Sequence, residues 1–205
     1  MEVNWLELLA GGMIGLFAAL LVVVVVEGFR GPNFKFEAYD TPPDSPNGVL
    51  LRFVHVRVTN ERRAFLLRFI DETAYLFTAE ILFANPTASR PLVEPMKARW
   101  PESEDEPATA KDTLRDYRET LPPGSSSSVN VAVKFNGEDE CWGFNTRSYQ
   151  YQPPPSSRWL RDPKKQLDDD RILVVVAVTA QGKTHRSQVF TLHNPDKTVV
   201  NFSLT

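Results

Sequence analysis

The feature that most constrains this chain is a run near its start, Leu8 to Val26, in which nineteen consecutive residues carry no charged and no strongly polar side chain. At about 1.5 Å of rise per residue, a helix of this length is roughly as long as the ~30 Å hydrocarbon core of a bilayer is thick. The run therefore predicts one transmembrane helix over residues 8–27. A short tail of residues 1–7 precedes it, and a juxtamembrane linker of residues 28–33 follows it.

The charges beside this run predict its orientation. Arg30 and Lys35 follow the run, whereas the tail before it contains acidic residues and no basic ones. Positive charge near a span favours the cytoplasmic side, and a cleaved signal peptide needs basic residues at its start. We therefore expect an uncleaved, single-pass anchor in the cell membrane, with the amino terminus outside and the rest of the chain in the cytoplasm. The opposite orientation stays open.

Within the run, Gly11 and Gly15 form a GxxxG spacing, which allows two transmembrane helices to approach closely. Glycine is also frequent in transmembrane helices that pair with nothing. The spacing makes Gly11 and Gly15 candidate helix–helix contacts, through which the chain would form a homo-oligomer or dock onto another membrane subunit. An ordinary lipid-exposed helix is the alternative.

The chain after Phe29 has the pattern of a β domain. Apolar and polar residues alternate with period two in short runs that are separated by Pro and Gly turns, and no strand–helix alternation repeats. The strands are expected at residues 34–38, 49–59, 74–84, 129–135, 171–179, 184–192 and 199–204. The run 171–179 is apolar on both faces, as in a central strand covered on each side, and Gln181-Gly182 is expected to turn it into 184–192 as a hairpin. The fold class is therefore mainly β, with one antiparallel β-sandwich over residues 34–205. Its order of strands and turns resembles an immunoglobulin-like or fibronectin-like domain in architecture, without the paired cysteines of antibody domains.

Several segments fall outside this alternation. Residues 101–111 contain a run of acids, two prolines and no large apolar side chain, so we expect a mobile loop. Residues 136–165 are rich in aromatics and prolines and predict a long irregular connection. Residues 64–70 fit either a short strand or a helical turn, and a further edge strand is expected around Arg99 and Trp100.

The long connection contains the candidate contact surface. Trp, Tyr and Arg are the residue types enriched at binding hot spots, because they combine a large buried area with a polar group. The candidate contacts with a partner or with the membrane surface are Trp142, Tyr149, Tyr151, Arg158, Trp159, Leu160 and Arg161. Alternatively, Trp142 and its neighbour Phe144 cap the core beneath the loop. Lys164 and Lys165 add basic charge, so either a protein or anionic lipid headgroups would fit this surface.

No residue pattern predicts catalysis, a cofactor or a metal. His185 and His193 would share one strand face but lie roughly 26 Å apart, so they cannot bind the same ion. We expect His55 to be a solvated side chain on the polar face of its strand, and the serine run 125–128 to be a loop. Cys141 is the single cysteine and follows three acidic residues, whose charges oppose thiolate formation.

Charge and cysteine content narrow the function further. The 23 basic residues all follow the apolar run, and only three of the 26 acidic residues precede or end it, so the head is balanced in charge and is a poor nucleic-acid binder. A single cysteine excludes an internal disulfide and favours a reducing compartment.

We expect a non-enzymatic protein-binding module or accessory subunit with a cytoplasmic head. The alternatives are an extracytoplasmic receptor or adhesion domain, or an enzyme or ligand sensor with a concave polar pocket.

Overall fold

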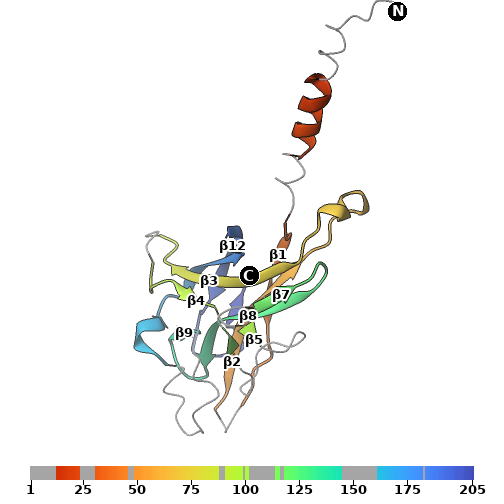
Figure 1. Ribbon diagram of the computed structural model, residues 1–205. Helices are drawn as coiled ribbons and strands as arrows, with labels where there is room; N and C mark the ends of the chain where they lie inside the picture. Colours follow the sequence, from red (N-terminus) through yellow and green to blue (C-terminus); the bar gives the residue numbers. More distant parts are fainter. Residues whose placement is uncertain are drawn as a thin grey trace, which may run out of the picture.

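The computed structural model describes residues 13–23, 31–45, 49–87, 91–98, 100–101, 114–115, 118–144, 161–181 and 183–205 (Figure 1). Antiparallel strands make up most of these residues. The α-helix of the described chain covers residues 13–23 and extends away from the strands. The prediction of a mainly β, antiparallel protein is confirmed.

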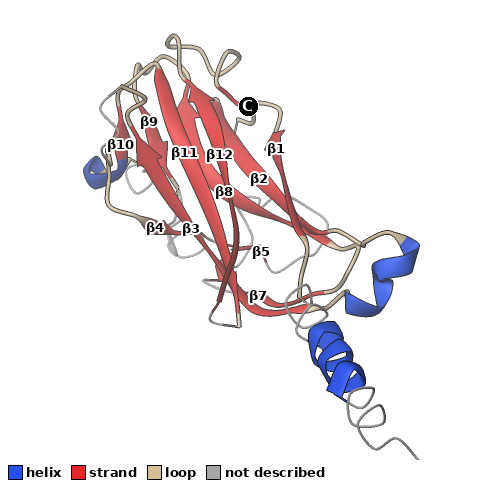
Figure 2. Ribbon diagram, turned by 90° about the horizontal axis from the view of Figure 1, so that it is seen from above, coloured by secondary structure: helices blue, strands red, loops and turns tan. Residues whose placement is uncertain are grey.

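Two large sheets form the domain (Figure 2). The first sheet has the strand order β1 (Phe34–Asp40), β2 (Leu51–Asn60), β8 (Ser126–Phe135), β9 (Cys141–Gly143) and β10 (Gln166–Leu167). The second sheet has the order β13 (Ser203–Leu204), β12 (Lys183–His193), β11 (Arg171–Ala180), β3 (Ala74–Ala84) and β4 (Met96–Lys97). The remaining strands are β7 (Arg118–Leu121), which pairs with β3, and the two-stranded unit of β5 (Trp100–Pro101) and β6 (Leu114–Arg115).

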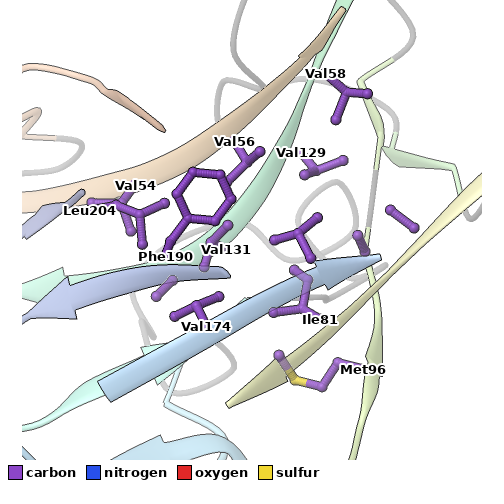
Figure 3. Packing of buried hydrophobic residues seen from close by; sticks show 14 of the residues in the cluster. Val54, Val56, Val58, Ile81, Met96, Val129, Val131, Val174, Phe190 and Leu204 are labelled. Atoms are coloured by element: carbon purple, nitrogen blue, oxygen red, sulfur yellow. The ribbon is translucent and has the colours of Figure 1, made fainter. Parts of the chain in front are cut away.

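The sheets pack face to face through the apolar residues of alternate positions. Val54, Val56 and Val58 of β2 are fully buried, and Ile81 and Val174 face them from β3 and β11 (Figure 3). This is the result that period-two alternation predicts, because successive side chains of a strand point to opposite faces of the sheet. Most of the domain's stability comes from removing this inner layer from water.

The antiparallel pairing also confirms most predicted strands and their turns. β3 covers residues 74–84 as predicted, and β11 runs between β3 and β12 at the centre of the second sheet. β11 and β12 form the predicted hairpin around Gln181, whose φ of 51° places it in the left-handed region used by tight turns. The outward side chains of β11 are partly exposed rather than fully covered.

Of the two alternatives for residues 64–70, the structure shows the helical turn, as the 3-10 helix η2 (Phe65–Ile70). Other elements differ from the prediction. The serine run is not a loop: β8 begins at Ser126, which pairs with Thr59. The connection 136–165 is not wholly irregular, since it contains β9 and the 3-10 helix η5 (Pro163–Lys165). The final strand is only two residues long, and Val200, within the predicted range 199–204, is 69% exposed.

Two predictions fall partly or wholly on residues outside the described ranges. Among the described residues, no helix is both long and apolar enough to cross a membrane. The helical residues 13–23 are the middle of the predicted span, and the rest of that span lies outside the described ranges. The predicted mobile loop 101–111 lies outside them too, apart from Pro101 in β5.

Candidate functional site

The outer face of the first sheet, which points away from the second sheet, carries a second apolar cluster. A sheet face turned away from the core normally carries polar residues and meets water. Here all the residues of the cluster are at most 8% exposed. We call them the outer-face cluster: Leu51, Phe53, Val133, Phe135, Trp142 and Phe144.

The rings of this cluster meet edge to face. Phe53 and Phe144 have centroids 5.3 Å apart at an interplanar angle of 69°, and Phe135 and Trp142 have centroids 5.8 Å apart at 72°. Aromatic pairs favour this arrangement because the positive edge of one ring meets the negative face of the other. Trp142 is placed here because it lies opposite Val133 in the β8–β9 ladder.

Arg161 lies directly on this cluster. Its guanidinium carbon is 3.8 Å from the centroid of Phe135 and 5.8 Å from that of Trp142. Its Nε also donates to both carboxylate oxygens of Glu138, at 2.9 and 3.1 Å. The cation–π contact and the ion pair together hold the chain at Arg161 against the sheet. Two of the predicted contact residues, Trp142 and Arg161, are thereby brought together.

The other predicted contacts cannot be placed in the same way. Tyr149, Tyr151, Arg158, Trp159 and Leu160 lie outside the described residues, as does Gly11 of the predicted helix–helix contact. For Gly15, a Cβ would meet no atom within 4 Å, so its face of the helix is open. The predicted contact surface and the predicted helix pairing both stay predictions.

His55 continues the outer face and corrects the prediction of a solvated side chain. It is fully buried, because the rings of Tyr39 and Phe53 lie 6.4 and 6.2 Å from it, and its Nδ1 donates to Asn130 Oδ1 at 2.7 Å. Burial lowers the pKa of His55 to about 4, and the bond to Asn130 opposes this shift only in part. His55 is therefore neutral at pH 7. The sequence signal for this pair is Asn130, a polar residue between Val129 and Val131 of β8.

A hydroxyl lies beside this imidazole, but it is not arranged as a nucleophile. Thr41 Oγ1 is 3.5 Å from His55 Nε2, and it donates its proton to the backbone oxygen of Phe53 at 3.0 Å. A nucleophile activated by histidine would donate to the imidazole instead. The group of Thr41, His55 and Asn130 thus joins β2, β8 and the end of β1.

An edge groove of about 490 Å³ opens beside Arg161. β4 and β10 are the edge strands of the two sheets, and the groove lies between the segment at β4 and the segment at η5. Its lining residues are Leu92, Val93, Glu94, Pro95, Met96, Asp162, Lys164 and Lys165. Sequence reasoning missed its apolar side. The sequence signal for it is the pair Leu92-Val93 between Pro91 and Pro95, because proline within a sheet is confined to edges and bulges.

Charges of both signs surround this groove. Lys165 Nζ lies 3.3 Å from the Asp162 carboxylate, which also accepts the backbone N–H of Lys164 at 3.1 Å. Burial tends to raise the pKa of Asp162, but the Lys164 N–H and the Lys165 ammonium outweigh it, so the pKa is lowered. Asp162 stays ionised and holds η5 in place. The exposed Lys164 and Glu94 remain at the surface of the groove.

Gly143 explains why the sheets meet closely beneath this groove. A Cβ on Gly143 would lie 2.7 Å from Met96 Cε and 3.1 Å from Phe83 Cε2, closer than side chains tolerate. The missing Cβ lets Met96 of β4 fill the space against β9. The floor of the groove is therefore packed and apolar.

Two further titratable groups are buried near β9. Cys141 lies 3.7 Å from the backbone oxygen of Leu167, and burial raises the pKa of its thiol to about 12, against the opposing effect of nearby Lys134. Lys134 is itself buried and donates to Asn194 Oδ1 and to the backbone oxygen of Asp139. Cys141 is therefore a protonated thiol in the core, and Lys134 ties the end of β8 to the following loops. Among the described residues, no three His, Cys, Asp or Glu side chains are placed to hold a metal ion.

Comparisons with protein-family models, with curated proteins and with solved structures give no match to this chain. Its function must therefore be argued from its own surfaces, because one fold can carry many functions.

Proposed function

We propose that this protein is a non-enzymatic, single-pass membrane protein whose β-sandwich head binds another protein or serves as an accessory subunit. The observation that carries the proposal is the exposure of the helix at residues 13–23. Its eight large apolar side chains are between 53% and 69% exposed. A helix that is apolar on every side is stable only when something apolar surrounds it, and a lipid bilayer does so.

The orientation rests on charge and on the cysteine. Arg30 and Lys35 follow the apolar run, and basic residues on that side favour a cytoplasmic head. Cys141 is a buried free thiol, which suits a reducing compartment. We therefore place the head in the cytoplasm. A receptor or adhesion head outside the cell is the alternative, and the same experiment distinguishes the two.

The strand order supports an immunoglobulin-like sandwich. The neighbours β1, β2 and β8 correspond to strands A, B and E of that fold, and β3, β11 and β12 to strands C, F and G. The departure lies in β9, which occupies the place of strand D beside β8 but follows β8 in the chain. Sandwiches of this kind present loops and edges to their partners.

The edge groove is the binding surface that fits this role best. Its apolar floor and its charged surroundings of both signs match the anatomy of protein interfaces, in which an apolar centre is enclosed by a polar rim. Its volume suits one or two side chains of a partner rather than a long peptide. Arg161, which lies 5.8 Å from the centroid of Trp142, directly precedes the lining residue Asp162 in the chain.

Fractionation of cells tests the anchor. The full chain should stay with the membranes after washing at alkaline pH, whereas a variant without residues 1–29 should be found in the soluble fraction. Protease added outside intact cells should leave the head whole. Release of the full chain by the alkaline wash would refute the anchor, and digestion of the head in intact cells would favour the receptor alternative.

The same membranes test the groove. A photo-crosslinking amino acid at Lys164 should form a covalent adduct with a second protein, while the same amino acid at Val189 should not. Val189 is a suitable control because it is 56% exposed and lies on the second sheet, away from the groove. Equal labelling at both positions, or none at Lys164, would count against the groove.

A further inference from the structure

Exposed apolar side chains also gather around η2. Phe65 is 80% exposed and Leu67 is 47% exposed. Such exposure of large apolar side chains in one short element is uncommon unless the element meets another apolar surface. Tyr75 and Leu76, at the start of β3, are 49% and 62% exposed and follow η2 closely in the chain.

The element η2 is attached to the chain that leads to the apolar helix. Arg63 Nη1 donates to the backbone oxygen of Gly31 at 3.0 Å, and Gly31 and Asp71 form a parallel bridge. Arg63 also pairs with Asp71 at 3.2 Å. Gly31 has a φ of 142°, which disfavours other residues. The point at which the chain enters the head is therefore fastened to the base of η2.

Chain length then limits the distance of η2 from the membrane. Gly31 lies five positions after Val26, the end of the apolar run. Even fully extended, five residues reach about 18 Å. Figures 1 and 2 both show η2 at the end of the sandwich from which the helix of residues 13–23 extends.

The side chains of η2 match the chemistry of a lipid headgroup region. Arg68 is exposed, and its guanidinium lies 5.8 Å from the centroid of Phe65. Arg62, three positions before Phe65, is also exposed, and its Nε donates to the backbone oxygen of Pro123 at 3.1 Å. Elements that lie at the membrane interface combine aromatic and aliphatic residues with arginine or lysine, because the apolar groups enter the acyl boundary while the cations meet phosphates.

We propose that η2 is a second membrane contact, which inserts Phe65 and Leu67 into the headgroup region of the bilayer that the helix crosses. This inference rests on the proposed membrane anchor. Two attachment points would hold the sandwich at a defined tilt, whereas a single flexible attachment would let it rotate. The edge groove would then face a constant direction relative to the membrane.

The test uses the purified full chain in vesicles of phosphatidylcholine and phosphatidylserine, with no other protein present. An environment-sensitive fluorophore is attached to Phe65→Cys or to Val200→Cys. Val200 is the matched control, since it is 69% exposed and lies far from η2. Its backbone oxygen accepts a hydrogen bond from Arg52, at the end of β2 that is opposite to the end that leads into η2. Cys141 is buried, so the unsubstituted protein should take up little label.

The label at position 65 should be quenched by brominated lipids at least fivefold more than the label at position 200, and its emission should shift to the blue. Arg62→Gln with Arg68→Gln should reduce the quenching in vesicles that contain phosphatidylserine. Equal quenching at both positions would overturn the inference even when the chain floats with the vesicles. Shielding of position 65 only in native membranes would point to a protein partner instead and would also overturn it. A chain that does not float with the vesicles would refute the anchor itself, and the inference with it.

Discussion

The two sheets differ on their outer faces, although their sequences alternate in the same way. On the first sheet, Phe53, Val133 and Trp142 point away from the core and are at most 8% exposed. On the second sheet, Val189 occupies an equivalent outward position and is 56% exposed, and Val175 is only half-buried. The alternation of residues with period two therefore predicts an inner and an outer face for each strand, but it does not predict which sheet has its outer face covered by other segments. On the first sheet, part of the covering comes from Arg161, which returns to the sheet from a distant part of the chain.

The two described histidines with side-chain partners, His55 and His193, differ in burial in the same way as the two outer faces. His55 on the first sheet is fully buried and hydrogen-bonded to Asn130, while His193 on the second sheet is partly exposed and lies 3.1 Å from Thr205 Oγ1. Burial excludes the charged form of an imidazole, because the ion loses its hydration. The covered outer face thus makes the stability of the fold depend on the protonation of His55.

The largest expected effect is the acid sensitivity that His55 confers. Its pKa is about 4 in the folded protein against 6.5 in the unfolded chain, so between these values the unfolded state binds more protons. The free energy of unfolding should therefore fall as the pH falls from 6.5 to 4, by up to about 3 kcal/mol. Urea denaturation at a series of pH values measures this.

Two variants distinguish the contribution of His55 to this pH dependence from that of the other titrating groups. His55→Gln should lower stability at pH 7, through the lost bond to Asn130, and should flatten the pH dependence between 6.5 and 4. His193→Gln leaves His55 intact, so the fall with pH should remain. If His55→Gln keeps the full pH dependence, the buried neutral imidazole is not its source.

A smaller effect comes from a matched pair of valines. Val133→Ala on the covered face removes two buried methyl groups and should lower the free energy of unfolding by about 2 kcal/mol. Val189→Ala on the open face should change it by less than about 0.5 kcal/mol. Equal losses in urea denaturation would mean that the second sheet is also covered in solution.

The smallest effect should come from the arginine that lies on the covered face. Arg161→Gln loses the contact with Phe135 and the ion pair with Glu138. The side chains of Arg161 and Glu138 are 27% and 29% exposed, so the substitution should lower the free energy of unfolding by about 1 kcal/mol. Lys197→Gln breaks an ion pair with Asp139 at 64% and 67% exposure and should cost nothing measurable. Thermal melts of both variants test the difference. A neutral Arg161→Gln would show that the outer-face cluster stays covered without this cation.

Most of the strands could be predicted from the sequence, because each depends on a local pattern. The alternation of apolar and polar residues predicted β2, β3, β8 and β11. The turn signal at Gln181 predicted the β11–β12 hairpin. Such patterns act over a few residues, since the pleat of a strand sends neighbouring side chains to opposite faces. The mainly β class and the antiparallel arrangement followed from them.

The candidate site could be predicted only in part. Sequence reasoning singled out Trp142 and Arg161 by residue type, and the fold brings them together across nineteen positions of chain. It did not find the burial of His55, the apolar side of the edge groove or the exposure of Phe65, since each depends on which distant segment returns to cover a surface. By itself, the sequence determined which segments form most of the longer strands, because alternation is local, while the ends of β8 and β13 differ from the predicted bounds. Only the tertiary structure decided which polar and apolar side chains lose water, because burial is a property of all the segments that meet at one place.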